Sequence, residues 1–449
     1  MEKTAIQIVE TFQNAGYETY FAGGSVRDLL MGHEPQDYDI ATAARPDEIE
    51  KLIDAMPHDT KTVPIGKQFG VILGIVSGHH YEIATFRSDS STSDGRRPDA
   101  VLFTSAKEDA VRRDFTINGL FYDPLKKKVI DYIGGQQDIQ DHILRFIGEP
   151  HERVKEDHLR LLRAVRFKNQ FGFSYDSHTR VALSELHHLV NDISRERVQE
   201  ELTKILLHPH RAHSFKELEE LGMLGLLLPE LMVCKGVKQP HEYHLEGDVL
   251  THVLKSLHDL PPEWSEKCLN WAILLHDIGK PATFEQGTDR IHFNGHAELS
   301  AKMAFEILKR LKFSGADAAK ITWLIEHHMT IGFIPEMRLA HRVNLFFHPW
   351  FEDLMKLHYA DEHGTMPIQL DLYERIMKMY HEFKEEKLLE DHFKPMLTGD
   401  DLMREFGLSP GPKIRNLLTD LREARIEGKI KTLEDEKMWV KNDLEKMNS

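Results

Sequence analysis

The sequence is poor in cysteine, lacks long apolar runs and has no excess of positive charge. Its two cysteines, Cys234 and Cys268, do not have the spacing of a metal or redox motif, so we expect buried thiols in a reducing cytoplasm. No apolar run is long enough to span a bilayer, which argues against a membrane partner. The net charge of −16 argues against indiscriminate nucleic-acid binding but is compatible with a local basic groove.

The beginning of the sequence also lacks the features of a targeting segment. Residues 1–17 follow an amphipathic helical pattern with acidic side chains, unlike a secretory signal or a transit peptide. The composition, 41% hydrophobic and 29% charged, is typical of globular proteins. Without a targeting segment, we expect a cytoplasmic protein. A length of 449 residues is too great for one core, so we also expect several domains.

The pattern of apolar residues changes near residue 140. Before it, short β-branched segments at 70–78, 81–87 and 127–135 predict strands, and the polar segment 87–99 predicts a loop. After it, apolar residues recur at helical spacing to the end of the chain. The sequence therefore predicts an α/β domain followed by an all-α remainder. The expected segments are an α/β head at 1–140, a helical neck at 141–205, a helical body at 206–375 and a helical tail at 376–449.

The segments GGSVRD and DYD carry the first candidate site. Asp37 and Asp39 are two positions apart, so in a strand both carboxylates point to one side, where they can bind Mg²⁺. Gly24 allows the backbone to approach a phosphate, a helix starting near Val26 adds its N-terminus, and Arg27 adds a cation. This combination predicts a nucleoside triphosphate positioned for nucleotidyl transfer. A tight turn before a solvated acidic strand end is the alternative.

The segment RRDFTINGL offers groups for the rest of the nucleotide. Arg113 can neutralise triphosphate charge, and Asp114 and Asn118 are four residues apart, on one face of a predicted helix, where they can bond ribose hydroxyls. A capped helix with a solvated basic end is the alternative. Glu82, in the predicted strand YEIATFR, is a candidate third carboxylate near the metal.

The segment EDHLRLLRAVRF places a charged row beside an apolar row on a predicted helix. Asp157, Arg160, Arg163 and Arg166 recur every three residues, and the arginines repel one another unless an anion lies across them. Asp157 and Arg160 together offer acceptors and donors that can imitate the edge of a base. An amphipathic helix with an ion-paired face is the alternative.

GGSVRD followed by DYD resembles the signature of the tRNA nucleotidyltransferase and bacterial poly(A) polymerase family, in the polymerase β superfamily. RRDFTINGL, DYIGGQQDI, EDHLRLLRAVRF and SRERVQEEL are similar to its further motifs in the same order, over residues 20–205. The resemblance implies a mixed-sheet head that binds Mg²⁺, CTP and ATP and extends the 3′ end of tRNA without a nucleic-acid template. It also implies that Asp157 and Arg160 select the base. The motifs are equally compatible with addition of CCA, of CC or of A alone.

Histidines lie on successive apolar helical segments of the predicted body, residues 206–375. Each buried imidazole needs a partner, and a shared metal would satisfy several at once. The candidate ligands are His252, His276, Asp277, His296, His327, His328 and Asp361. The pair His276-Asp277 followed by IGKP resembles the HD phosphohydrolase signature, which implies one or two divalent metals. An HD fold without activity is the alternative, and the nearby loop HEYHLEGD is a weaker candidate for the mouth of the site.

The segment 398–430 resembles the closing segment of family members that carry an HD domain. Its Gly-Pro turn precedes a basic helix that we expect to contact phosphates of the tRNA acceptor arm. The basic residues are Lys413, Arg415, Arg422 and Arg425. A solvated helix face is the alternative.

Two other functions are compatible with these motifs. One is a poly(A) polymerase of the same fold, although such enzymes usually carry basic extensions, and this chain is acidic. The other is an HD phosphohydrolase whose head only binds RNA or nucleotide. The presence of Asp37, Asp39 and Arg113 favours a working transferase head.

Overall fold

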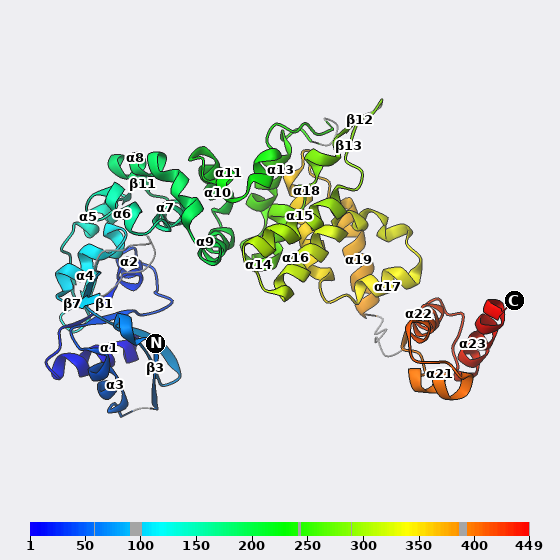
Figure 1. Cartoon of the computed structure of the whole chain (residues 1–449), viewed down its shortest axis with the longest axis horizontal. Coiled ribbons are helices and arrows are strands. Elements are labelled where there is room, and N and C mark those ends of the chain that lie inside the picture. Colours follow the sequence, from blue (N-terminus) through cyan, green and yellow to red (C-terminus); the bar gives the residue numbers. More distant parts are fainter. Residues whose placement is uncertain (58, 90–100, 241–243, 289, 386–392, 449) are drawn as a thin grey trace. The chain divides into compact units, whose positions relative to one another are not determined.

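The computed structural model divides the chain into two compact units (Figure 1). The first comprises Met1–Met232 with Arg310–Lys312, and the second comprises Val233–Lys309 with Phe313–Ser449. The structure describes residues 1–57, 59–89, 101–240, 244–288, 290–385 and 393–448.

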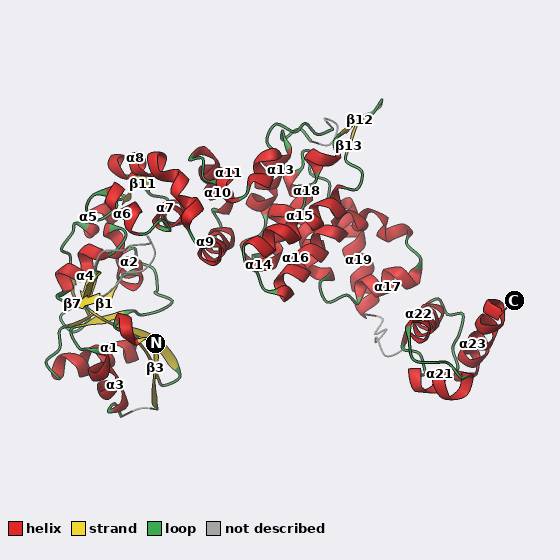
Figure 2. Cartoon of the chain, viewed as in Figure 1, coloured by secondary structure: helices red, strands yellow, loops and turns green. Residues whose placement is uncertain are grey.

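A seven-stranded mixed sheet forms the centre of the N-terminal part of the first unit (Figure 2). Its strands in spatial order are β3 (Thr60–Gly66), β4 (Val71–Val76), β5 (His79–Thr85), β2 (Ile40–Thr42), β1 (Thr19–Ala22), β8 (Phe121–Asp123) and β9 (Lys128–Ile130). Neighbouring strands are antiparallel except β2 and β5, which are parallel. In β4 every second residue is buried, as expected for a strand with one covered face.

Two helices pack on this sheet through apolar residues at helical spacing. Helix α1 (Glu2–Asn14) buries Ile8 and Phe12, and α3 (Pro46–Asp54) buries Ile49 and Ile53. A short hairpin of β6 (Arg87–Asp89) and β7 (Val101–Phe103) closes the base of the loop predicted at 87–99. Residues 90–100 of that segment lie outside the described residues.

Helices make up most of the rest of the first unit. They are α2 (Gly24–Leu30), α4 (Ala106–Arg112), α5 (Gly135–Gln140), α6 (Pro150–Glu156), α7 (Arg160–Phe171), α8 (Ser177–Leu186), α9 (Arg195–Leu207), α10 (Arg211–Glu220) and α11 (Leu224–Leu227). Helix α12 (Pro229–Val233) crosses from the first unit into the second. The two-residue strands β10 (Ile143–Leu144) and β11 (Ser174–Tyr175) pair in parallel beside α7.

In its described residues the second unit is mainly helical, with one short hairpin of β12 (Glu285–Gln286) and β13 (Ile291–His292) (Figure 2). Its helices are α13 (Val249–Asp259), α14 (Lys267–Leu275), α15 (His296–Arg310), α16 (Gly315–His327), α17 (Leu339–Phe346), α18 (Phe351–Gly364), α19 (Asp371–Glu385), α21 (Gly399–Phe406), α22 (Pro412–Ile426) and α23 (Leu433–Asn448). Helices α13, α14, α16 and α18 contact one another around a core that includes Trp271.

The predicted fold class, an α/β head followed by helices, is confirmed. The three strands expected at 70–78, 81–87 and 127–135 correspond to β4, β5 and β9. Both cysteines are free thiols and buried. Within the described parts of the chain, none of the helices combines the length and the apolar character needed to cross a membrane.

Candidate functional site

The glycine turn joins β1 to α2 at the edge of a large pocket. Gly23 has a left-handed φ of 66°, which favours glycine, and a Cβ there would also lie 2.8 Å from the Arg113 guanidinium and displace it. The backbone N–H of Ala22 donates to the carbonyl of Asp39 at 2.9 Å, which holds the acidic segment beside the turn. Helix α2 begins at Gly24, two residues earlier than predicted, because Gly23 already serves as its N-cap.

Three carboxylates converge next to this turn. The sequence predicts that Asp37 and Asp39 lie within a strand, but both lie just before β2. Because β2 and β5 are parallel with Ile40 opposite Ile83, Glu82 lies beside Asp39, and all three carboxylates line one pocket. Burial raises the pKa of Asp39 to about 6, and the charge of Glu82 acts in the same direction. Acidic oxygens that repel one another in this way fit a divalent cation.

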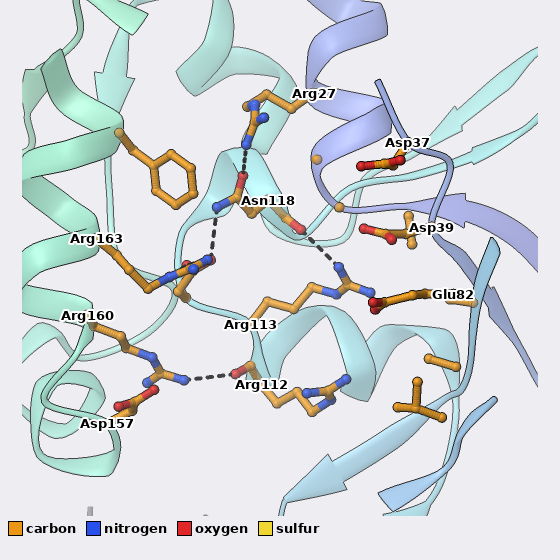
Figure 3. A pocket seen from close by; sticks show the side chains of 18 of the residues that line it. Arg27, Asp37, Asp39, Glu82, Arg112, Arg113, Asn118, Asp157, Arg160 and Arg163 are labelled. Carbon is orange, nitrogen blue, oxygen red and sulfur yellow. Dashed lines mark hydrogen bonds and ion pairs between the residues drawn. The ribbon is translucent and has the colours of Figure 1, made fainter. Parts of the chain in front are cut away.

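The pocket has a volume of about 930 Å³ and is lined by arginines from several helices. Figure 3 shows Asp37, Asp39 and Glu82 on one side of it and Asp157, Arg160 and Arg163 on the other. Every residue predicted for the nucleotide site lines it: Gly24, Arg27, Asp37, Asp39, Arg113, Asp114, Asn118, Asp157, Arg160, Arg163 and Arg166. A single cavity therefore combines carboxylates for a cation with guanidinium groups for phosphates.

Asp114 and Asn118 do not share a helical face, contrary to the prediction. Helix α4 starts at a capping box of Ser105 and Glu108 and ends at Arg112, so Arg113 leaves it in an extended conformation. Thr116–Asn118 then form a 3₁₀ turn, in which Asn118 Nδ2 donates to Asp114 Oδ1 at 3.0 Å.

A polar chain runs from Asn118 through the pocket wall. Arg27 Nη1 donates to Asn118 Oδ1 at 2.7 Å (Figure 3). Arg163 Nε donates to Asp114 Oδ2 at 2.8 Å. Burial alone would raise the pKa of Asp114, but the charge of Arg163 and the hydrogen bonds lower it to about 2. Asp114 is therefore ionised at neutral pH and fixes both Asn118 and Arg163.

The charged row of the predicted base-selecting helix has protein partners. Helix α7 begins only at Arg160, so Asp157 lies before it. Arg160 donates to Glu156 and to the carbonyls of Arg153 and Arg112, and it makes no hydrogen bond to the Asp157 side chain. The three arginines are each held by one carboxylate, which relieves part of the repulsion expected from the sequence. The ion pairs are Arg160–Glu156, Arg163–Asp114 and Arg166–Glu201.

The second candidate site is a buried cluster in the second unit, hereafter the histidine cluster. It comprises His252, His276, Asp277, His296, His328 and Asp361. Asp361 Oδ1 lies 2.9 Å from His252 Nε2 and 3.4 Å from His276 Nε2, and Asp277 Oδ1 lies 3.4 Å from His296 Nε2. His327, also predicted, is outside the cluster because its ring stacks on Trp323 at 4.3 Å.

Three of these histidines direct the same nitrogen into the cluster. The Nδ1 atoms of His276, His296 and His328 each donate to the carbonyl three residues earlier, at 2.8, 2.8 and 2.6 Å. In the neutral imidazole their Nε2 atoms carry a lone pair, and those of His296 and His328 are only 3.2 Å apart. Burial alone would lower the pKa of His276, but Asp277 raises it to about 10, so a metal at this Nε2 would replace a proton. Burial also lowers the pKa of His328 to about 3, which keeps it neutral.

Converging lone pairs of this kind fit a bound metal. His276 Nε2 and Asp277 Oδ1 are buried without a hydrogen-bond partner, whereas Asp277 Oδ2 faces the ammonium group of Lys280. Two adjacent ligand groups that share no residue result, one of His252, His276 and Asp361 and one of Asp277, His296 and His328. Imidazole nitrogen and carboxylate oxygen suit a transition-metal dication, and two such groups can hold one ion or two.

Three family models match successive parts of the chain. They are "Poly A polymerase head domain" at residues 19–145, "Probable RNA and SrmB- binding site of polymerase A" at 172–234, and "HD domain" at 249–379. The CC-adding tRNA nucleotidyltransferase of Thermus thermophilus is 31% identical over 434 residues, covering 94% of this chain and 93% of that protein. The chain belongs to the tRNA nucleotidyltransferase family.

Other tRNA nucleotidyltransferases match a shorter region with higher identity. The CCA-adding enzymes of Geobacillus sp. and Lactobacillus helveticus are 44% and 41% identical over 228 and 213 residues, or 51% and 47% of this chain. The chain spans about half the length of these relatives, 54% and 52% respectively.

Solved structures of tRNA nucleotidyltransferases share the fold. The Bacillus stearothermophilus CCA-adding enzyme in complex with CTP has a TM-score of 0.69 at 23% identity, over 99% of this chain and 98% of that chain. The Thermotoga maritima CCA-adding enzyme complexed with tRNA has a TM-score of 0.57 at 20% identity, over 98% and 94%.

Several pocket residues of this family member were not predicted from the sequence. In the arginine-lined pocket they are Arg87, Arg112, Arg153, Glu156, Phe167 and Lys204. Arg112 precedes Arg113 directly, and Arg153 lies in α6, whose C-cap residue is Asp157, so proximity in sequence was an available signal. Lys204 comes from α9 and depends on tertiary packing.

The histidine cluster also has neighbours that the sequence indicated only weakly. Lys280, in the IGKP segment, places Nζ 2.6 Å from Asp277 Oδ2. Glu246, in the loop HEYHLEGD, accepts from His244 Nδ1 at 2.6 Å and faces His252 Nδ1 at 3.4 Å. Gly279 permits the turn after Asp277 to pack on α15, since a Cβ there would lie 2.6 Å from the carbonyl of His296.

The basic tail helix is less uniform than predicted. Arg425 Nη1 donates to Glu436 Oε1 at 3.0 Å, and the Glu436 side chain is fully buried, so this pair joins α22 to α23. Arg425 thus has a structural partner. Lys413 and Arg415 are exposed.

Proposed function

We propose that this chain adds CCA, or its terminal part, to the 3′ end of tRNA without a nucleic-acid template. The observation that carries the proposal is the single pocket in which Asp37 and Asp39 face a row of guanidinium groups. The near full-length relative that adds CC to tRNA, and the fold shared with enzymes complexed with CTP and with tRNA, support the same reaction. An acidic chain of net charge −16 favours this reaction over synthesis of poly(A).

In this proposal the carboxylate side of the pocket performs the transfer. Asp37 and Asp39 would hold Mg²⁺, with Glu82 beside them. When bound, Mg²⁺ supplies the charge that stabilises the triphosphate and favours ionisation of the attacking hydroxyl. The RNA 3′ oxygen forms a bond to the α-phosphorus, the bond from that phosphorus to the bridging oxygen breaks, and pyrophosphate leaves. Arg113, anchored by Asp109, would neutralise charge on the departing phosphates.

The helical side of the pocket would choose and hold the nucleotide. Asp157 and Arg160 offer an acceptor and a donor to the base edge, as the sequence predicted. Asp114, Asn118, Arg27, Arg163 and Arg166 would contact the ribose and the phosphates. Residues 1–140 then carry out the transfer, 141–205 choose the nucleotide, and 376–449 contact the tRNA through Lys413 and Arg415.

The direct experiment is a substrate panel. Purified protein is incubated with Mg²⁺, each labelled nucleoside triphosphate, and tRNA transcripts that end in the discriminator base, in C or in CC. We expect CMP or AMP to be added only at the position where CCA requires it. Long adenylate tails on all three transcripts would instead indicate a poly(A) polymerase, and no addition to any of them would contradict the proposal.

A second candidate activity belongs to the histidine cluster. We propose that it binds one or two divalent metals and hydrolyses a phosphate ester, as the converging Nε2 atoms and the buried Asp277 Oδ1, which has no hydrogen-bond partner, support. Metal content measured on protein reconstituted with Mn²⁺, Co²⁺, Ni²⁺ or Zn²⁺ tests binding, and hydrolysis of p-nitrophenyl esters tests the chemistry. Binding without hydrolysis would indicate a structural metal.

A further inference from the structure

The aromatic ring of Phe167 is the shared contact of three pocket arginines. The guanidinium carbons of Arg166, Arg163 and Arg27 lie 4.1, 5.0 and 5.4 Å from its centroid. Phe167 is only 5% exposed, yet it lines the pocket. These distances lie in the range of favourable cation–π contact, about 6 Å or less.

Each of these arginines is tied at one edge by a hydrogen bond within the protein. Arg163 donates to Asp114, Arg166 donates to Glu201 and Gln170, and Arg27 donates to Asn118 and Asp28. A guanidinium has five N–H donors, so these bonds leave others for a ligand in the pocket. The hydrogen bonds fix one edge of each group, and the contact with the ring fixes its plane.

Without the aromatic ring between them, the positive charges of the three arginines would repel one another more strongly. Burial lowers the pKa of Arg27, and the charge of Arg166 acts in the same direction. The negative face of an aromatic ring offsets such repulsion without occupying a single N–H donor, which a carboxylate partner would do.

The ring itself is held by other aromatic residues. Phe115 meets it edge-on with centroids 5.7 Å apart, and Phe171 stacks on it at 5.9 Å and 11°. Phe171 in turn lies 4.4 Å from the guanidinium carbon of Arg27. The ring is thus a rigid platform, because its orientation is set by packing rather than by the ligand.

We propose that Phe167 is a positioning residue for nucleotide binding. Its ring orients Arg27, Arg163 and Arg166 so that their remaining N–H groups meet the ribose and the triphosphate. This inference rests on the proposed nucleotidyltransferase function. Because all nucleoside triphosphates share these parts, Phe167 acts equally on CTP and ATP, in contrast to Asp157 and Arg160, which act on the base.

The test compares three variants of the full chain. Phe167→Leu keeps an apolar side chain but removes the ring face, and Phe167→Tyr keeps the face. The matched control is Phe146→Leu, which removes a buried ring from the same core. Phe146 stacks on Phe115 at 4.8 Å, and among the residues that the structure describes no guanidinium lies over it.

We expect Phe167→Leu to raise KM for CTP and for ATP by the same factor, about tenfold, which corresponds to about 1.4 kcal/mol. The equilibrium Kd for ATP, measured by calorimetry without tRNA, should rise equally, while kcat stays within about threefold. Phe167→Tyr should restore both constants. Phe146→Leu should lower Tm but leave KM and Kd unchanged.

Three results would overturn the inference. They are unchanged constants in Phe167→Leu, a rise for only one of the two nucleotides, or the same rise in Phe146→Leu. If Phe167→Leu does not fold, Phe167→Met takes its place with the same expectations. If the wild-type protein added no nucleotide to tRNA, the proposed function would fail, while the Kd for ATP would still decide the role of Phe167.

Discussion

Arg197 on α9 binds both carboxylate oxygens of Asp157. Its Nη1 donates to Oδ1 at 2.9 Å and its Nη2 donates to Oδ2 at 2.8 Å. A two-point contact of this kind fixes the plane of the carboxylate and not only its position. Asp157 lines the pocket, so Arg197 sets the direction in which its remaining lone pairs meet a ligand.

We therefore predict that Arg197→Ala relaxes the choice among nucleotides. Freed from its partner, Asp157 can rotate, and the loss of one well-directed hydrogen bond to a base edge costs about 1–3 kcal/mol, or roughly 5- to 100-fold in selectivity. The measurement is the ratio of kcat/KM for the correct nucleotide to that for the other three. Arg195→Ala, on the same helix but away from the pocket, is the control. An unchanged ratio in Arg197→Ala would mean that Asp157 does not contact the base.

Asp39→Asn should lower the rate of nucleotide addition by at least about a hundredfold. The substitution removes a predicted Mg²⁺ ligand and keeps the shape of the side chain. Mg²⁺ should also raise the Tm of the wild type and not that of the variant. Addition at near wild-type rate in Asp39→Asn would exclude Asp39 as a metal ligand.

The same substitution should stabilise the protein in the absence of metal. In the folded protein the pKa of Asp39 is raised from the ordinary value of 3.8 to about 6. Ionisation of Asp39 therefore destabilises the fold progressively as the pH rises from about 3.8 to about 6. In EDTA, the Tm of Asp39→Asn relative to wild type should therefore increase between pH 4 and pH 7. A Tm difference that does not vary with pH would mean that burial and the charge of Glu82 do not raise the pKa of Asp39 in the folded protein.

The double substitution His276→Ala and Asp277→Ala should separate the two sites. Neither residue lies in the arginine-lined pocket, so tRNA extension should persist within about tenfold, while metal binding by the histidine cluster and any phosphatase activity are lost. A thermal melt serves as the control, because metal-binding energy can also be folding energy. Lost extension with an unchanged melt would show that the two sites are coupled.

Glu246→Gln should weaken metal binding at the histidine cluster by about 10- to 100-fold. Among the described residues, the Nδ1 of His252 faces a carboxylate, that of Glu246, whereas the Nδ1 atoms of His276, His296 and His328 donate to backbone carbonyls. Metal affinity is measured by competition with a chromogenic chelator, and Glu298→Gln, on the exposed face of α15, is the control. Equal affinity in both variants would mean that Glu246 holds only the loop.

Some site residues could be predicted from their immediate neighbours in the sequence. Asp37 and Asp39 are two positions apart and follow the glycine turn with only α2 between them, so their shared pocket depends on one short segment of the chain and was predictable. His276 and Asp277 were likewise predictable, because an adjacent pair at the end of an apolar helix leaves few ways to satisfy two buried polar groups.

Contacts between distant segments were not predictable in the same way. Arg197 and Asp157 are separated by 40 residues, and nothing in either segment specifies the other. The regular spacing at Asp157 suggested one continuous helix, yet α7 starts at Arg160, because Asp157 accepts from the N–H of Leu159 ahead of the first turn. Asp114 and Asn118 were assigned to a helical face for the same reason, although the helix ends at Arg112.

The sequence of the product 3′ ends tests the central claim most directly. Transcripts of a tRNA that end in its discriminator base or in CC are incubated with Mg²⁺, CTP and ATP together, and the ends are sequenced for wild type and for Asp37→Asn. The account predicts that the wild type adds CCA, or its part of CCA, to at least one of the two transcripts and stops there, and that Asp37→Asn leaves the ends unchanged. Tails of any other sequence or of indefinite length, or equal extension by Asp37→Asn, would contradict it.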